Sequence, residues 1–306
     1  MSHRHDVPGV PGAIGRTLTG SLGRSVKRSA HAVSLATGRL TAGQRVLPGF
    51  LIIGAQRCGT TSLYRALSQH PLVLKPVLRK GVHYFDVAYE HGLRWYRAHF
   101  PLRATAARLH RMYGHRPIAF ESSPYYLFHP LAAARIAQAL PGVKLIVLVR
   151  DPVERAYSAH AHELARGYER EPCFERAVLL EDERLAGEPE RLCADPRAGS
   201  HAHRHHAYLA RGRYAEQLAR IEPLVGRDHL LVVDSHRFFT SPATVYAEVL
   251  RFLGLPELTV PGFACHNARP RAAPMPASLR RRLAAHFAPW DSRLTPWLGH
   301  PPSWLR

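Results

Sequence analysis

The segment FLIIGAQRCGTTS at residues 50–62 constrains the fold more than any other part of this sequence. A short apolar run ends at Gly54, and leucine and tyrosine side chains at helical spacing follow Thr60. Apolar runs of this length are typical of buried parallel strands. Between strand and helix, Gly54 and Gly59 have the spacing of a loop whose backbone N–H groups cradle a phosphate. The sequence therefore predicts a phosphate-binding loop.

Three further apolar segments have the length and composition of strands, at residues 117–121, 143–149 and 229–234. Helical patterns follow the last two of them, one running through Arg166 and the other covering 244–256. Strands that alternate with helices indicate a parallel sheet. We therefore predict an α/β fold, a P-loop-like three-layer sandwich with a central, mostly parallel sheet flanked by helices.

The chain divides into an N-terminal segment and one large domain. Residues 1–46 contain no acidic residue after Asp6, and their composition predicts a flexible basic tail. As an alternative, residues 13–40 form a weakly amphipathic basic helix that contacts an anionic membrane surface. Residues 47–306 are expected to form a single domain. Its further helices are predicted at 173–186, 201–221 and 277–287.

Composition argues against several classes of protein. No apolar stretch is long enough to span a membrane, and no apolar segment in the N-terminal region resembles a secretion signal. The four cysteines form no C-x-x-C pair, which argues against a zinc ribbon and favours a cytoplasmic location. The net charge of +19 is carried almost entirely by arginine. It fits a nucleic-acid or membrane binder, an arginine-preferring genome or a polyanion site, and charge alone does not choose among these.

The phosphate loop carries its positively charged residue at a different position from the loop of nucleoside triphosphatases. In those enzymes a lysine precedes the first helical serine or threonine, whereas this chain has Thr60 at that place and Arg57 earlier. For a magnesium site, Asp234 is a poor candidate. The loop therefore predicts an anion bound without a metal ion. The alternatives are a plain glycine turn and an ATP-dependent phosphotransferase.

A second motif, RDPVERAYSAH, spans residues 150–160 directly after a predicted strand. Arg150 stands at the carboxyl end of that strand, where open α/β sheets bind ligands, and Ser158 lies two helical turns further on. An arginine fork and a hydroxyl suit a phosphate monoester. The same segment also reads as a capped helix start, with Asp151 as the N-cap and Glu154 three residues later. Both interpretations can hold, at different residues.

Together these motifs resemble the sulfotransferases that use 3′-phosphoadenosine 5′-phosphosulfate (PAPS). Three more segments resemble the branch with the heparan sulfate enzymes and bacterial carbohydrate sulfotransferases: KGVHYFD (80–86), GLRWYRAHFP (92–101) and ESSPYYLFHP (121–130). The resemblance covers residues 48–255 in order. It implies transfer of a sulfuryl group from PAPS to an acceptor hydroxyl on a carbohydrate or glycosylated molecule, with no metal required.

The resemblance also assigns the residues that hold the donor. The loop residues Arg57, Cys58, Gly59, Thr60 and Thr61 would wrap the 5′-phosphosulfate. The 3′-phosphate would be held by Arg150 and Ser158. From the C-terminal segment, Arg269 or Arg271 would reach over the donor.

The chain departs from the family's pattern at three positions. Arg57 stands where the loop usually has lysine, Gly81 where the glycosaminoglycan enzymes have a catalytic glutamate, and Ser122 where they have lysine. Arginine keeps the charge but does not donate a proton at neutral pH. Arg57 would still stabilise the leaving phosphate oxygen. The candidates for the general base are, in order, His83, Asp86 and Glu121.

Two competing functions remain, an ATP-dependent phosphotransferase and a non-catalytic binder of nucleic acid or anionic membrane. Aromatic residues gather in the motifs, at Trp95, Tyr84 and Tyr125 among others, which favours a pocket and no specific nucleic-acid partner. The histidines at 201, 203, 205 and 206 lack partners at metal-ligand spacing, so we expect no metal there. Cys58 lies at a helix N-terminus, which lowers a thiol pKa, yet direct transfer needs no thiol nucleophile.

Overall fold

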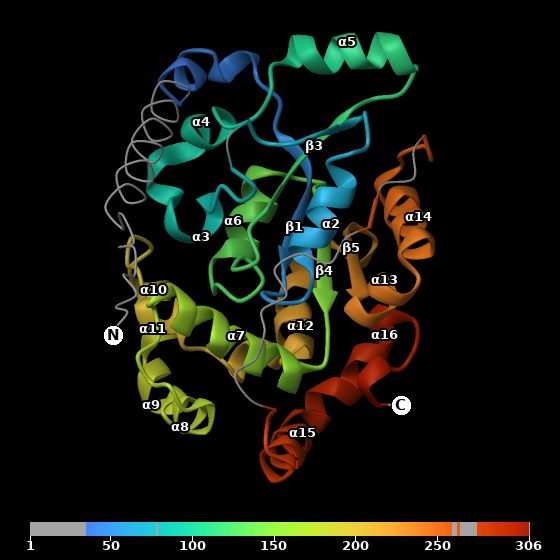
Figure 1. Cartoon of the computed structure of the whole chain (residues 1–306). Coiled ribbons are helices and arrows are strands. Elements are labelled where there is room, and N and C mark those ends of the chain that lie inside the picture. The colour runs from blue at the N-terminus through green and yellow to red at the C-terminus, as the bar shows by residue number, and fades with distance from the viewer. Residues whose placement is uncertain (1–34, 78, 259–261, 264–273, 306) are drawn as a thin grey trace, which may run out of the picture.

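The computed structural model describes residues 35–77, 79–258, 262–263 and 274–305. Its centre is a five-stranded parallel sheet of order β2-β3-β1-β4-β5 (Figure 1). The strands are β1 (Pro48–Gly54), β2 (Val73–Leu74), β3 (Ile118–Ser122), β4 (Lys144–Val149) and β5 (Leu230–Asp234). The predicted α/β class and parallel sheet are confirmed.

Helices flank the sheet (Figure 1). In the first half of the chain they are α2 (Thr60–Leu67), α3 (Tyr84–Val87), α4 (Gly92–Arg97), α5 (Arg103–Tyr113), α6 (Ala132–Ala139) and α7 (Pro152–Arg166). Next come α8 (Phe174–Leu179), α9 (Glu181–Leu185), α10 (Glu188–Ala194), α11 (His201–His205) and α12 (Tyr214–Val225). The last are α13 (Ser235–Thr240), α14 (Pro242–Leu253), α15 (Ala277–Asp291) and α16 (Thr295–Leu298). Among the described residues no helix is both long and apolar enough to cross a membrane.

Helices cover both faces of the sheet, so both faces of the central strands are buried. This is why these strands are continuous apolar runs in the sequence. Every residue of β1 except Gly49 is buried, and so is every residue of β4 except Lys144. Phe50 of β1 stacks on Phe120 of β3 with ring centroids 4.7 Å apart. Burial of these side chains is the main favourable contribution to folding. It also fixes β1 at the centre, so the loop after Gly54 emerges in the middle of the sheet edge.

The helix predicted at 201–221 is broken in two, and that prediction was wrong. Helix α11 ends at His205, and α12 begins only at Tyr214. Glu181 of α9 causes the break, because its buried carboxylate accepts three consecutive backbone N–H groups. The donors are Tyr208 (2.8 Å), Leu209 (2.6 Å) and Ala210 (2.8 Å). These N–H groups bind the carboxylate instead of continuing the helix.

The segment just before β1 packs on the domain, earlier than the expected boundary at residue 46. Ala42 is buried, and Arg45 pairs with Leu102 in an isolated antiparallel bridge. The Arg45 guanidinium also donates to the Phe100 carbonyl oxygen. These contacts tie residues 42–45 to the region of α4. The possible amphipathic helix at 13–40 lies, up to residue 34, outside the described residues.

The Glu181 contacts generate a stability prediction. Glu181→Gln presents N–H hydrogens where the backbone also donates, so we expect the free energy of unfolding to fall by about 2–4 kcal/mol. Urea denaturation followed by circular dichroism measures this change. The matched control is Glu183→Gln, an exposed position two residues away, which should stay near wild type. Equal stability of the two variants would contradict this explanation of the helix break.

Candidate functional site

A cleft of about 470 Å³ opens at the carboxyl ends of the central strands. The loop after β1 and the segment before α3 form one wall, and α7 and α11 form the other. Its charged lining consists of five cations, one carboxylate and three histidines: Arg57, Lys80, Arg166, Arg204, Arg211, Glu163, His83, His162 and His205. This excess of positive charge favours a polyanionic ligand.

The segment between β1 and α2 has the strand–loop–helix order that its sequence predicted. Arg57 and Gly59 both adopt positive φ angles, 69° and 91°. The left-handed conformation suits Gly59, because glycine has no Cβ to strain there. Helix α2 begins at the next residue, Thr60, and presents its N-terminal turn to the cleft. A helix N-terminus attracts anions through its N–H groups and its dipole.

The two predicted phosphate motifs meet in space. Arg57 Nε donates to Ser158 Oγ at 3.0 Å, and the Arg150 guanidinium lies 3.4 Å from the Arg57 carbonyl oxygen. Arg150 also pairs with Glu154 at 3.6 Å. Asp151 caps α7 by accepting from the N–H groups of the second and third helical residues, as predicted. The segment therefore caps a helix and presents a candidate phosphate site at once.

Lys80 is a site residue that the sequence reasoning did not single out. Its Nζ donates to Thr61 Oγ1 at 2.9 Å and lies 3.4 Å from Thr60 Oγ1. Burial, with the nearby positive charge of Arg65, lowers the Lys80 pKa to about 7. A lysine thus stands at the phosphate loop although the loop itself carries arginine. Two signals could have identified it: lysine is rare in this chain, and Lys80 opens the KGVHYFD motif.

His83 and Asp86 form a pair at the cleft wall. His83 has a positive φ of 57°, and its N–H donates to Ser123 Oγ at 3.0 Å. Its Nδ1 lies 2.7 Å from Asp86 Oδ2, and the Asp86 side chain is fully buried. A carboxylate on Nδ1 fixes the ring and places the proton on that nitrogen, which leaves Nε2 as an acceptor. Since His83 lines the cleft, it has the geometry of a general base.

Glu121, the third candidate for the base, has a structural position instead. It is fully buried and does not line the cleft. Its donors are Val82 N–H (2.7 Å), Ser123 Oγ (2.6 Å), Tyr126 OH (2.7 Å) and Tyr96 OH (3.1 Å). Burial raises the Glu121 pKa, and the donors oppose that rise. Four donors occupy both oxygens, so this carboxylate holds the wall of the cleft in place.

The packing around Gly81 leaves no room for a glutamate side chain beside Lys80. A Cβ built on Gly81 would lie 2.5 Å from the Ser122 carbonyl oxygen and 3.0 Å from Ser123 Oγ. The first distance is closer than real Cβ atoms approach, so any side chain would displace the backbone. The segment before His83 therefore packs directly against the end of β3.

Cys58 does not face the cleft. Its side chain is buried, with Sγ 3.5 Å from the hydroxyl of Tyr214. Burial raises the Cys58 pKa, so our expectation of a lowered value at the helix N-terminus was wrong. Desolvation outweighs the helix dipole at this site. Only the backbone of Cys58 is placed to contact a ligand.

A buried chain of polar contacts supports the far wall, and the sequence did not predict it. Arg211 donates to Gln56 Oε1 at 2.6 Å, and Gln56 Nε2 donates to Glu163 at 2.8 Å. His205 Nδ1 lies 2.9 Å from the same carboxylate. The Arg211 guanidinium also lies over the ring of Tyr125, 4.8 Å from its centroid. These contacts fix Gln56 within the phosphate loop.

The remaining residues considered in the sequence analysis lie away from the cleft or outside the described residues. His203 is buried with Nδ1 2.8 Å from Tyr125 OH, and burial lowers its pKa to about 3. Asp234, the magnesium candidate, caps α13 and accepts from both the N–H and the hydroxyl of Ser303. Within the described part of the chain, no three His, Cys, Asp or Glu side chains gather as a metal site would require. Arg269 and Arg271 lie outside the described residues.

Comparison with known proteins identifies the family. Residues 47–261 match the family model described as "Sulfotransferase domain". The human bifunctional heparan sulfate N-deacetylase/N-sulfotransferase 3 is 30% identical over 85% of this chain, and the match covers 31% of that relative's length. The human heparan sulfate glucosamine 3-O-sulfotransferase 6 is 28% identical over 86% of this chain and 75% of its own.

A solved structure is similar as well. The crystal structure of a sulfotransferase from Alicyclobacillus acidocaldarius matches with a TM-score of 0.60 and 31% identity, over 85% of this chain and all of that one. The chain spans about a third of the bifunctional relatives it matches, 31% in each of the first three. The family model covers most of the present sequence. This chain therefore belongs to the sulfotransferase family.

Proposed function

We propose that this protein transfers a sulfuryl group from PAPS to a hydroxyl group of a carbohydrate acceptor. The observation that carries the proposal is the contact of Ser158 with Arg57, a residue that lines the cleft, because this contact joins the two phosphate motifs. Two relatives are named as heparan sulfate sulfotransferases, which supports the donor type and the carbohydrate class of acceptor. His83, which lines the same cleft and contacts the buried carboxylate of Asp86, supports proton transfer from a hydroxyl.

The residues of the cleft fit a donor with several negative charges. Arg150 and Ser158 would hold the 3′-phosphate, and Arg57, Thr60 and Thr61 the 5′-phosphosulfate. The one carboxylate in the lining, Glu163, is already engaged by His205 and Gln56, so it adds little repulsion. Arg57 and Lys80 supply the positive charge that a magnesium ion supplies in nucleotide-triphosphate enzymes, so the proposal requires no metal ion.

The mechanism assigns one task to each side chain. When bound, PAPS supplies an activated sulfuryl group whose leaving group is a phosphate oxygen. Arg57 and Lys80 stabilise the negative charge that develops on that oxygen, and Lys80 can also donate a proton where Arg57 cannot. His83 accepts the proton of the acceptor hydroxyl at Nε2. Asp86 keeps the ring oriented and stabilises the imidazolium that forms.

The direct test is transfer of labelled sulfate from PAPS to a panel of polysaccharides and glycosides, in the presence of EDTA. We expect label on a carbohydrate hydroxyl. Binding of the desulfated product, 3′-phosphoadenosine 5′-phosphate, without labelling of any carbohydrate would reject the acceptor class and keep the donor. Transfer of phosphate from ATP with magnesium would reject the sulfotransferase activity itself.

Lys80 generates a pH prediction. With a pKa of about 7, Lys80 is mostly charged below pH 7 and mostly neutral above it in the free protein. A bound anion favours the charged form, so affinity for 3′-phosphoadenosine 5′-phosphate should fall between pH 7 and 9, by up to about tenfold per pH unit. Calorimetry in buffers of different ionisation enthalpy should show proton uptake on binding.

Lys80→Arg and Lys80→Met are the matched variants for this prediction. Arginine stays charged throughout the range, so affinity should vary little between pH 7 and 9. Methionine removes the charge, so its affinity at pH 7 should resemble that of wild type near pH 9. An unchanged pH dependence in Lys80→Arg would show that another group titrates.

Substitution of His83 should impair catalysis, whereas substitution of Glu121 should impair stability. His83→Asn should lower kcat by about 10²–10⁴-fold with little change in donor-product affinity, because it removes the base and not a donor ligand. Asp86→Asn should lower kcat by about tenfold or more through the ring it orients. Glu121→Gln should instead lower the free energy of unfolding by about 2 kcal/mol, because it disturbs four buried hydrogen bonds.

Steady-state kinetics and urea denaturation separate these outcomes, with the exposed Glu90→Gln as a control that should match wild type. A Glu121→Gln protein of normal stability that has lost transfer would make Glu121 the base. A His83→Asn protein with normal kcat would remove His83 from the mechanism.

A further inference from the structure

Helix α5 (Arg103–Tyr113) is unusual in that none of its residues is buried. Only Ala106 and Leu109 pack partly against the core. It lies along one end of the molecule, beside the N-terminal segment before β1 (Figure 1). An amphipathic helix normally buries one face, and here the described part of the chain covers that face only in part, at Ala106 and Leu109.

The positive charge around α5 is not balanced by carboxylates within the described part of the chain. Residues 91–120 contain six arginines and no aspartate or glutamate. Arg103, Arg108, Arg111 and Arg116 are exposed, and none forms an ion pair with a carboxylate among the described residues. Arg108 and Arg111 are neighbours on one helix face and repel each other. An anion on this face would relieve that repulsion.

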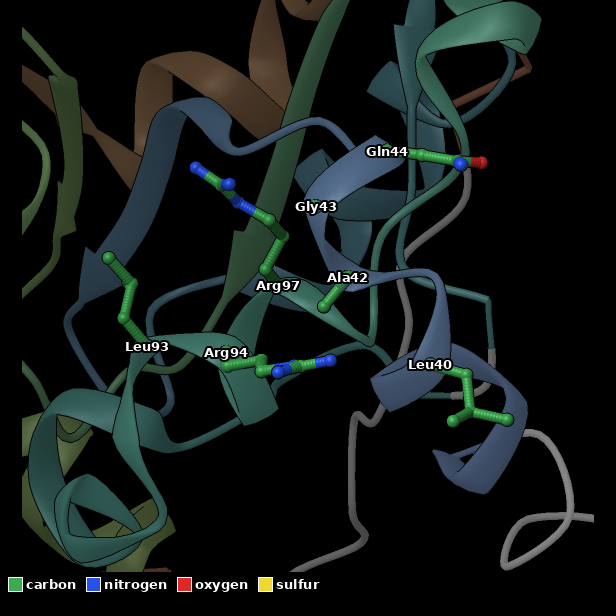
Figure 2. A pocket seen from close by; sticks show the side chains of 7 residues that line it. All are labelled: Leu40, Ala42, Gly43, Gln44, Leu93, Arg94 and Arg97. Atoms are coloured by element: carbon green, nitrogen blue, oxygen red, sulfur yellow. The ribbon is translucent and has the colours of Figure 1, made fainter.

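A groove of about 1100 Å³ lies beneath α5, at the end of the sheet opposite the catalytic cleft. Its cations are Arg45, Arg97, Arg103 and Arg116, with His110 beside them, and its apolar lining includes Val46, Leu47, Ile118, Leu253 and Leu255. Arg97 also lines a smaller pocket of about 520 Å³ with Arg94 and Leu40, which Figure 2 shows. Cations thus surround apolar surface in two adjoining hollows.

Exposed apolar side chains extend this surface. Leu40 is 81% exposed, Met112 58% and Tyr113 39%. Leu40 belongs to the segment that lines the smaller pocket, and the other two end α5. Exposed apolar side chains among arginines are the composition of helices that lie in the interface of an anionic bilayer.

The chemistry of the groove argues against a sugar polymer. Its lining contains no carboxylate, amide, hydroxyl, tryptophan or tyrosine side chain, which are the groups that bind sugar hydroxyls and stack on sugar rings. An amphiphile with an anionic head and an apolar tail satisfies both its arginines and its apolar lining.

We propose that α5, with the segment around Leu40, is a docking surface for a membrane containing anionic lipids. The arginines bind the lipid phosphates, and Leu40, Met112 and Tyr113 enter the acyl boundary. Because the catalytic cleft lies at the opposite end of the sheet, it stays open to solvent when this surface is docked. The docking surface is independent of the reaction in the cleft.

The test is co-sedimentation of the full chain with vesicles of phosphatidylcholine, alone or mixed with phosphatidylserine. We expect binding only to the mixed vesicles, falling as salt rises. The double variant Arg108→Glu with Arg111→Glu should weaken binding by at least about tenfold, because each basic residue near the surface contributes to attraction. Met112→Gln should weaken it further through lost apolar contact.

The control variants carry the same kinds of substitution at exposed positions outside α5. Arg281→Glu with Arg293→Glu reverses two exposed arginines in and after α15, and Leu179→Gln alters an apolar side chain that is 70% exposed on α8. Both should bind vesicles as wild type does. The α5 variants should keep wild-type affinity for 3′-phosphoadenosine 5′-phosphate, which also shows that they are folded.

Three outcomes would overturn the proposal. Vesicle binding that survives the Arg108 and Arg111 reversals would place the contact elsewhere, for example on the basic residues before 35. Absence of binding to the mixed vesicles would reject the membrane as occupant. Binding of soluble dextran sulfate that the α5 variants abolish, with no vesicle binding, would assign the surface to an anionic polysaccharide.

Discussion

The contact between Arg57 and Ser158 is the interaction on which the arrangement of this site depends, because it holds the two phosphate motifs together. It joins the loop after β1 to α7, two segments far apart in the sequence, at the carboxyl ends of adjacent parallel strands. Positive charge is concentrated there, and carbonyl oxygens together with the carboxylates of Glu154 and Glu163 partly balance it. Arg211, for example, is held by Gln56 and by two backbone carbonyls. An anionic donor would complete this balance.

The departures from the family's motifs form a consistent set. Gly81 packs against the end of β3 where a glutamate is usual, and the same segment brings Lys80 to Thr61 and His83 to Asp86. A lysine is absent from the phosphate loop itself, and Lys80 contacts the loop from a neighbouring segment. In the proposed mechanism the base lies two residues further along the chain, at His83, whose ring contacts the buried carboxylate of Asp86. The proposed mechanism therefore keeps both a positive charge and a proton acceptor, with different residues in each role.

Sequence patterns predicted the features that depend on local order. The strands around 50 and 146, the loop with Gly59 and the helix after Asp151 follow from apolar runs and capping residues that are adjacent in the chain. Features set by distant contacts escaped prediction. Glu181, which belongs to α9, breaks the helix expected at 201–221. Burial raises the Cys58 pKa, opposite to the direction expected from the helix N-terminus. Lys80 was missed because its contact with Thr61 joins segments 19 residues apart, and the local sequence does not predict that contact.

The most direct measurement is calorimetric binding of 3′-phosphoadenosine 5′-phosphate without metal, to wild type and to Arg150→Ala, with ATP as the comparator. We expect binding in EDTA that Arg150→Ala weakens by at least about tenfold, because a charge-assisted contact to a phosphate is lost. ATP, which lacks the 3′-phosphate, should bind more weakly and respond little to this substitution. Tighter binding of ATP with magnesium, or an Arg150→Ala protein that binds as wild type does, would contradict the assignment of the donor site.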